Sequence, residues 1–104
     1  MKTRIENFSG IIKHSDERWL KEVLTNNLQR AGFNILDFTD HQFEKFGYSA
    51  VWLLGESHLA VHTFPENCNA YIELSSCLPK KGELFWENLS QEVVFAKEAR
   101  RIME

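Results

Sequence analysis

The sequence predicts an α+β fold, a two-layer sandwich in which a largely antiparallel sheet carries two helices on one face. Five short segments are rich in β-branched and aromatic residues and are bounded by turn residues, as strands are. Two longer segments carry apolar residues at helical spacing, one after the first predicted strand and one after the last. Two of the strands are separated only by Gly55-Glu56-Ser57, which indicates a hairpin.

The first strand is predicted over residues 8–14, where Gly10 suggests a bulge or a close approach of another backbone segment. Ser15 is a plausible N-cap for the helix that follows. Apolar side chains then keep a helical period as far as Ala31, and Gly32 suits the left-handed position just after a helix end. The first helix is therefore expected between Ser15 and Gly32.

The remaining predicted elements are four strands and one helix. Strands are expected over residues 33–38, 48–54, 58–64 and 69–76, with a polar loop over 39–47. Apolar residues recur at helical spacing over residues 83–101, which predicts a second helix. Three basic residues near its end, Lys97, Arg100 and Arg101, would complement the helix dipole. No strand is expected after this helix.

Strand parity predicts a homodimer. The apolar residues of the strand over 58–64 share one face, expected under the helices, whereas His62 shares the other face with Cys77 of the next strand. The preceding strand is apolar on both faces, and such strands are normally buried on both sides. We therefore expect Trp52 and Leu54 to lie between two sheets, in a dimer with layers of helix, sheet, sheet and helix.

Length and composition limit the class of protein. A chain of 104 residues is expected to form a single domain over residues 1–104. No apolar run approaches the ~18 residues that a membrane span needs, and no signal peptide is evident, so we expect a cytoplasmic protein without a membrane partner. The net charge of −3 argues against nucleic acid. Cys68, Cys77 and the four histidines offer no spacing for a metal site.

The most informative run, residues 55–66, reads Gly-Glu-Ser-His-Leu-Ala-Val-His-Thr-Phe-Pro-Glu. It places a hydroxyl nucleophile, Ser57, directly after an acidic residue and five positions before His62. Side chains five apart on a regular strand point to opposite faces. For the two to cooperate, Ser57 must lie in the hairpin turn or in a bulge, and Gly55 makes an irregular turn plausible there.

From Glu56 to Glu66 this run resembles the self-cleavage segment of the bacterial S-adenosylmethionine decarboxylases, Glu-Ser-His-(apolar)-x-(Ile/Val)-His-Thr-(aromatic)-Pro-Glu, without a mismatch. The resemblance implies that the Ser57 hydroxyl attacks the carbonyl of Glu56 and splits the chain between these two residues. A pyruvoyl group, the cofactor of the family, would remain at position 57. His62 matches the processing histidine of the family, and Ser49 sits where the family carries a second processing hydroxyl.

The resemblance also implies a reaction, the decarboxylation of S-adenosylmethionine for spermidine synthesis by a homodimer. The pyruvoyl ketone would take up the electrons left when carbon dioxide departs. Cys77, which closes the next strand, matches the proton donor of the family. Glu66 matches the carboxylate that holds the ribose diol of the substrate. Phe43 matches an aromatic residue on which the adenine stacks.

Three departures from the family pattern leave alternatives open. Leu78-Pro79 follows Cys77, where the family commonly has glycine. The predicted first strand lacks the acidic residue usually found there, and the customary last strand is expected to be missing. One alternative is a diverged pyruvoyl-dependent enzyme that acts on arginine or ornithine. Another is an unprocessed, non-catalytic homologue that serves as a binding or regulatory partner.

Overall fold

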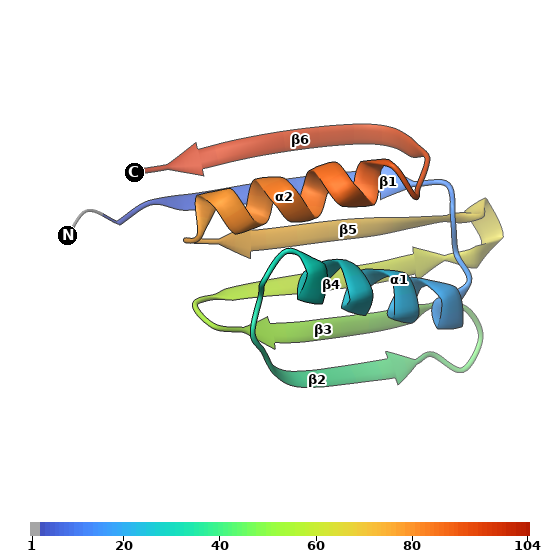
Figure 1. Ribbon diagram of the computed structural model, residues 1–104. Coiled ribbons are helices and arrows are strands. Elements are labelled where there is room, and N and C mark those ends of the chain that lie inside the picture. The colour runs from blue at the N-terminus through green and yellow to red at the C-terminus, as the bar shows by residue number, and fades with distance from the viewer. Residues whose placement is uncertain (1–2) are drawn as a thin grey trace.

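The protein forms one six-stranded antiparallel sheet with two helices on one face, as a computed structural model of residues 3–104 shows (Figure 1). In chain order the elements are β1 (Ile5–Ile12), α1 (Glu17–Arg30), β2 (Ile35–Gln42), β3 (Tyr48–Leu54), β4 (Ser57–Phe64), the 3-10 turn η1 (Pro65–Asn67), β5 (Asn69–Ser76), α2 (Pro79–Ser90) and β6 (Phe95–Met103). The sheet order is β2-β3-β4-β5-β1-β6. The predicted α+β class is confirmed.

The first helix, α1, lies close to its predicted position. Its N-cap is Asp16 rather than Ser15, and Leu20, Leu24 and Leu28 are fully buried against the sheet. Gly32 has a φ of 87°, the left-handed conformation expected just after the helix end. Helical periodicity of the apolar residues therefore predicted this element correctly.

The second predicted helix is wrong beyond residue 90. Helix α2 spans Pro79–Ser90, and the chain then turns and forms the edge strand β6, which pairs with β1. The basic residues Lys97, Arg100 and Arg101 lie on this strand and not at a helix end. Nearly all of β6 is exposed, so it lacks the alternating apolar pattern by which strands are recognised. Its conformation depends on hydrogen bonds to β1, which no local pattern encodes.

Gly10 allows β6 to approach β1 closely. A Cβ atom at Gly10 would lie 2.6 Å from the ring of Phe95 and 2.9 Å from the carbonyl oxygen of Lys97. The β1–β6 register also shifts between Ile11 and Ile12. The close approach predicted at Gly10 is therefore confirmed, and its partner is the strand that the sequence did not predict.

Strand β1 begins earlier than expected and contains an acidic residue. Glu6 lies within β1 and is almost fully buried, with its carboxylate bonded to Arg4 and Arg100. The expectation that the first strand has no acidic residue is therefore wrong. An ion-paired carboxylate can occupy a buried strand position that a hydropathy pattern assigns to an apolar residue.

Side-chain alternation along the strands follows the predicted parity in β4 and β5, and it corrects the residues assigned to β3. The helix-facing core contains Leu59, Val61, Ala70, Ile72 and Leu74, all fully buried. Trp52 and Leu54, expected between two sheets, are instead 1% exposed on this helix-facing side. The outer apolar residues of β3 are Val51 and Leu53, which are 37% and 51% exposed. The prediction therefore chose the wrong alternate residues of β3 for the outer face. The residues on that face are Val51 and Leu53, each one position before the residue that was predicted.

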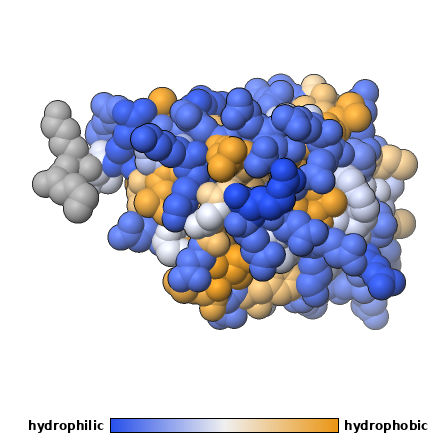
Figure 2. Space-filling view, viewed as in Figure 1, coloured by the Kyte–Doolittle hydropathy of each residue, from blue (hydrophilic) through white to orange (hydrophobic). Residues whose placement is uncertain are grey.

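Polar side chains predominate on the face that the helices form (Figure 2). Within residues 3–104, neither helix is long and apolar enough to cross a membrane.

Candidate functional site

The turn between β3 and β4 holds Glu56 in a strained conformation. Leu54 and Ser57 are paired across the hairpin, which leaves only Gly55 and Glu56 in the turn. Glu56 has a φ of 58°, whereas Gly55 does not adopt a positive φ. A non-glycine residue in the left-handed region costs ~1–2 kcal/mol. The strain of the turn therefore falls on the residue before the predicted cleavage point.

Ser57 begins β4 and points toward the helix layer. Its side chain is 8% exposed, and its hydroxyl donates a hydrogen bond of 2.8 Å to Oγ of Ser76. His62 lies on the opposite, outer face of the same strand. Five residues of strand separate their Cα atoms by ~16 Å. The expectation that the turn would bring Ser57 and His62 together within one chain is therefore wrong, because Ser57 keeps the regular alternation of β4.

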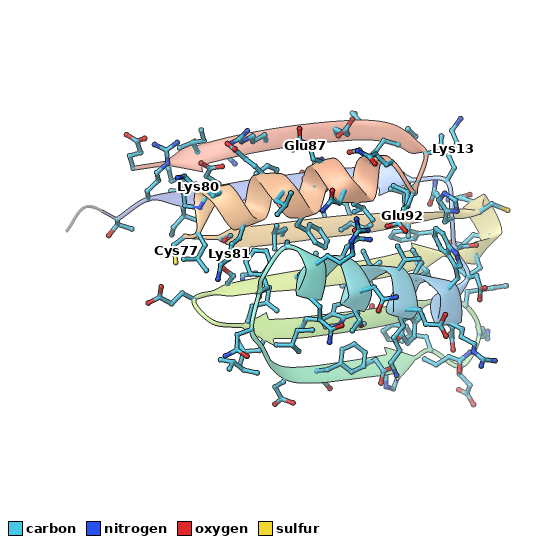
Figure 3. The ribbon with its side chains drawn as sticks, viewed as in Figure 1. Lys13, Cys77, Lys80, Lys81, Glu87 and Glu92 are labelled. Carbon is cyan, nitrogen blue, oxygen red and sulfur yellow. The ribbon has the colours of Figure 1, made fainter. Side chains whose placement is uncertain are left out.

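Cys77 contacts the carbonyl group that precedes Ser57. Its thiol donates a hydrogen bond to the backbone oxygen of Glu56, with an Sγ–O distance of 2.9 Å, and lies 3.7 Å from the Glu56 side chain. Cys77 follows β5 at the end of the strand nearest the β3–β4 turn (Figure 3). The structure thus brings Glu56, Ser57 and Cys77 into one group, called here the cleavage end.

A second group lies at the other end of β4. Ser49 and His62 are register partners, and Oγ of Ser49 is 2.7 Å from Nδ1 of His62. The ring of Tyr71 stacks beside His62 with centroids 6.4 Å apart. Burial, followed by a hydrogen bond from Tyr71 to the carboxylate of Glu73, raises the pKa of Tyr71. This tyrosine therefore stays neutral at physiological pH and offers His62 an uncharged ring.

Ser49 and His62 line a cavity of ~380 Å³. This cavity and its lining residues are called here the pocket end. Four residues predicted for the site line it together: Phe43, Ser49, His62 and Glu66. Its other lining residues are Phe46, Gly47, Tyr48, Thr63 and Phe64. Phe43 is about half exposed and lies edge-on to the ring of His41. Aromatic side chains beside a carboxylate suit a ligand that has both a flat ring and polar groups.

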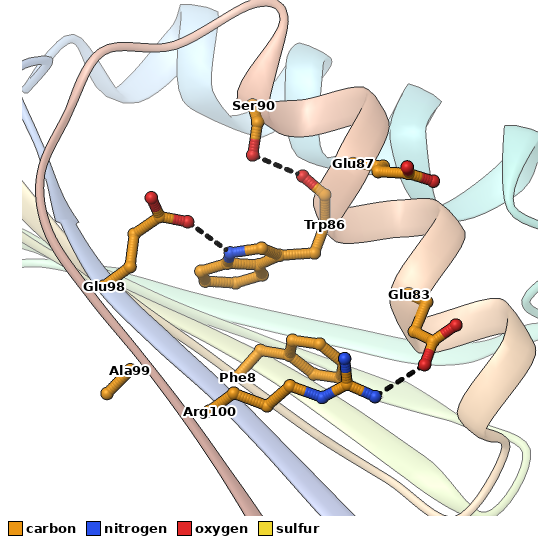
Figure 4. Close-up of a pocket in the computed structure, with 8 residues that line it drawn as sticks. All are labelled: Phe8, Glu83, Trp86, Glu87, Ser90, Glu98, Ala99 and Arg100. Carbon is orange, nitrogen blue, oxygen red and sulfur yellow. Dashed lines mark hydrogen bonds and ion pairs between the residues drawn. The ribbon is translucent and has the colours of Figure 1, made fainter.

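Another cavity, of ~620 Å³, lies between α2 and β6, and none of the predicted site residues lines it (Figure 4). Trp86 forms part of its wall and donates a hydrogen bond of 2.9 Å to Glu98. Arg100 lies over the ring of Phe8 and bonds to Glu83 at 2.6 Å. Most of its polar side chains thus bond to one another, which suits a structural role. Within residues 3–104, no three His, Cys, Asp or Glu side chains converge as a metal site requires.

The family assignment rests on the length of chain that matches. A family model of S-adenosylmethionine decarboxylase matches residues 7–101, which include both the cleavage end and the pocket end. The chain belongs to the S-adenosylmethionine decarboxylase family. This match also includes most of β6, so most of the last strand lies within the region that matches the family model.

Individual relatives agree with this assignment. The S-adenosylmethionine decarboxylase proenzyme of Prochlorococcus marinus is 40% identical over 65 residues, which cover 62% of this chain and 52% of the relative. The corresponding proenzyme of Synechococcus is 37% identical over 74 residues, covering 67% of this chain and 58% of the relative. The chain therefore spans about half the length of the curated relatives it matches.

A solved structure shares the fold. The adenosylmethionine decarboxylase from Aquifex aeolicus superimposes on all of this chain and on 92% of its own length, with a TM-score of 0.81 and 19% sequence identity. The likeness includes β6. The expectation that the family's last strand is missing is therefore wrong, because residues 95–103 form a strand at the sheet edge.

Sequence reasoning missed two buried polar residues beside the cleavage end of this family member. Ser57, Ser76 and Glu6 are register partners across β4, β5 and β1, and all three are buried. Strand parity could have found Ser76, because it shares a face with the apolar residues of β5. Nothing in the local sequence pairs Ser76 with Ser57, since that contact depends on the order of strands in the sheet.

Proposed function

We propose that this family member is a self-processing proenzyme that splits its chain between Glu56 and Ser57 and then decarboxylates S-adenosylmethionine. The observation that carries the proposal is the 2.9 Å hydrogen bond from Cys77 to the carbonyl oxygen of Glu56. A donor at this oxygen stabilises the negative charge that develops when a nucleophile attacks the carbonyl carbon. Ser57 supplies that nucleophile from the adjacent position in the chain.

The proposed cleavage begins as a transfer of the Glu56 acyl group from nitrogen to oxygen. A bond forms between Oγ of Ser57 and the carbonyl carbon of Glu56, and the peptide C–N bond breaks. The hydroxyl proton of Ser57 ends on the released nitrogen, so the step needs no external reactant. Loss of the Cα proton of residue 57 then breaks the ester and releases the Glu56 carboxylate. Water converts the dehydroalanine that remains into a pyruvoyl group, and ammonia leaves. The strained φ of Glu56 supports this reading, because breaking the peptide bond releases that strain.

The residues around position 57 fit a pyruvoyl group formed there. When present, such a group supplies the electron sink that decarboxylation needs. Ser76 offers a hydroxyl on the helix-facing side, and Cys77 offers a thiol proton on the outer side. In this proposal Cys77 returns a proton to the substrate carbon after carbon dioxide has left.

The pocket end supplies features that suit the rest of the substrate. We assign the Glu66 carboxylate to the ribose diol, through charge-assisted hydrogen bonds. The ring of Phe43 offers a surface on which adenine can stack, and an aromatic ring also attracts a sulfonium cation. Both residues line the cavity that contains His62 and Ser49.

A homodimer would unite the two ends of the site. The pocket end and the cleavage end lie at opposite ends of β4, too far apart for one substrate to bridge them within a chain. In a two-fold dimer the same surface of each chain meets its copy, so opposite ends of the two sheets can face each other. We therefore propose that the outer faces pack together, with Val51 and Leu53 between them. His62 of one protomer would then act beside Ser57 of its partner.

Two of the departures that suggested arginine or ornithine as the substrate are no longer present. The last strand exists as β6, and β1 contains the acidic residue Glu6. Only the Leu78-Pro79 sequence after Cys77 still departs from the family pattern. Release of carbon dioxide from each candidate by the processed protein decides the substrate. Activity on either amino acid, with none on S-adenosylmethionine, would contradict the proposed substrate.

Intact mass under denaturing conditions tests self-cleavage. We expect two fragments, residues 1–56 and a fragment with a blocked N-terminus that begins at position 57. Ser57→Ala should remain full length because it has no hydroxyl to start the acyl transfer, whereas the neighbouring variant His58→Ala should still cleave. A wild-type chain that stays intact after long incubation would favour the unprocessed binding partner.

Mixing two inactive variants tests the shared site. Ser57→Ala and His62→Ala should each stay uncleaved as separate homodimers. In a mixed dimer, Ser57 of the His62→Ala chain faces an intact His62 of the other chain, so that chain should cleave. Absence of cleavage after verified subunit exchange would show that His62 does not act across the dimer.

A further inference from the structure

We propose that Ser76 is a positioning residue for the self-cleavage, holding the Ser57 hydroxyl in place for attack on the Glu56 carbonyl. The inference rests on the proposed cleavage between those two residues. It assigns a function to a side chain that the family motif does not include.

The contact between the two serines is buried and specific. Ser76 is 1% exposed, and its Oγ atom lies 2.8 Å from Oγ of Ser57, within the usual range for a hydroxyl–hydroxyl hydrogen bond. The two residues are register partners on adjacent strands and point to the same face. The backbone of the sheet therefore places both hydroxyls, independently of any loop.

The other hydrogen bonds of Ser76 determine which hydroxyl donates. The backbone N–H of Leu78 donates to Oγ of Ser76 at 2.9 Å. The Ser76 hydroxyl donates a long hydrogen bond, 3.5 Å, to the carbonyl oxygen of Leu78, which directs its own proton away from Ser57. Ser76 Oγ therefore accepts from both Leu78 and Ser57. The Ser57 proton points toward Ser76, which leaves the lone pairs of its oxygen free toward the backbone.

Ser76 and Cys77 together hold the two sides of the reacting peptide. Consecutive residues at the end of a strand point to opposite faces of the sheet. Ser76 binds the Ser57 side chain on the helix-facing side, while Cys77 binds the Glu56 carbonyl oxygen on the outer side. The nucleophile and the carbonyl are thus positioned by neighbouring residues of one strand end. Ser76 keeps its own proton throughout, and the Ser57 proton ends on the released nitrogen.

The test compares cleavage rates of freshly synthesised protein. Ser76→Ala should slow the appearance of both fragments by about two- to ten-fold, the range for loss of one neutral hydrogen bond. Ser76→Thr, which keeps a hydroxyl, should cleave at close to the wild-type rate. The matched control is Ser75→Ala, which removes an adjacent serine from the outer face and should leave the rate unchanged.

A trapping experiment separates positioning from general loss of structure. Hydroxylamine cuts an ester but spares a peptide bond, so it releases residues 1–56 from any chain that has completed the acyl transfer. Ser76→Ala should release less of this fragment than wild type at matched times, with its thermal unfolding midpoint above the assay temperature. If Ser76→Ala fails to fold, Ser76→Cys replaces it, since a thiol keeps the volume but hydrogen-bonds weakly.

The outcomes distinguish the two proposals. If wild type cleaves and the folded Ser76 variant cleaves equally fast, the role of Ser76 is overturned while self-cleavage stands. If wild type does not cleave and yields no fragment with hydroxylamine, the proposed function fails, and the role of Ser76 fails with it. Slow cleavage by Ser76→Ala, restored in Ser76→Thr, supports the positioning role.

Discussion

Replacing Leu53 with alanine should weaken the proposed dimer without unfolding the protomer. Leu53 is 51% exposed on the outer face of β3, the face opposite the two helices. Trp52, one position earlier, is 1% exposed and donates a hydrogen bond of 3.0 Å to Thr25 of α1. Variants at these two neighbouring positions therefore separate association from folding, because Leu53 would face the proposed partner whereas Trp52 faces the core.

The expected magnitude follows from the exposed half of the leucine. Full burial of a leucine side chain stabilises by ~1.5–3 kcal/mol, so covering the exposed half of Leu53 contributes ~0.8–1.5 kcal/mol. Each residue of a two-fold interface is counted twice, once in each protomer. Leu53→Ala should therefore weaken the dimer by roughly 1–3 kcal/mol, which raises the dissociation constant about 5- to 150-fold.

The assay is sedimentation equilibrium over a range of protein concentrations, in a Ser57→Ala background that keeps every chain full length. Leu84→Ala is the matched control, because Leu84 is 42% exposed on α2, in the helix layer on the opposite side of the sheet. It should leave the dissociation constant unchanged. Trp52→Asp should unfold the chain instead, since it places a charge in the core.

Two results would refute the reasoning about this interface. One is an unmutated chain that remains monomeric at micromolar concentrations. The other is a Leu53→Ala dimer as tight as the parent, with Leu84→Ala weakened in its place. Either result would contradict the proposal that the outer faces form the dimer interface and bring the pocket end of one chain to the cleavage end of the other.

Three further predictions concern single residues. Glu56→Gly, made in the Ser57→Ala background, should raise the free energy of unfolding in urea by ~1 kcal/mol, because glycine adopts the φ of 58° without strain; an unchanged value would mean that the turn stores no strain. Glu66→Gln should weaken S-adenosylmethionine binding by ~1.5–3 kcal/mol in calorimetry while self-cleavage proceeds normally, and unaltered binding would exclude Glu66 as a substrate ligand. Gly10→Ala should lower the melting temperature, because its Cβ would lie 2.6 Å from the Phe95 ring, and a stable variant would show that β6 moves aside freely.

Local patterns predicted those elements whose own residues carry the signal. The strands predicted over 48–54 and 69–76 match β3 and β5 at both ends, because alternating side chains mark a half-buried strand. Leu20, Leu24 and Leu28 likewise marked α1 by their spacing. Strand β6 carries no such signal, since it lies at an edge and is mostly exposed. Its pairing with β1 overrides the helical spacing of its few apolar residues.

The candidate site residues were predicted from the sequence, but their grouping was not. The run from Glu56 to Glu66, together with Cys77, identified the family and suggested the proposed chemistry, because both depend on residue types at set spacings along one chain. Only the tertiary structure placed Cys77 against the Glu56 carbonyl and Ser76 against the Ser57 hydroxyl. These contacts join strands that are distant in sequence, and register between strands follows from the whole sheet. For the same reason, only the fold shows that Ser57 and His62 point to opposite faces of the sheet.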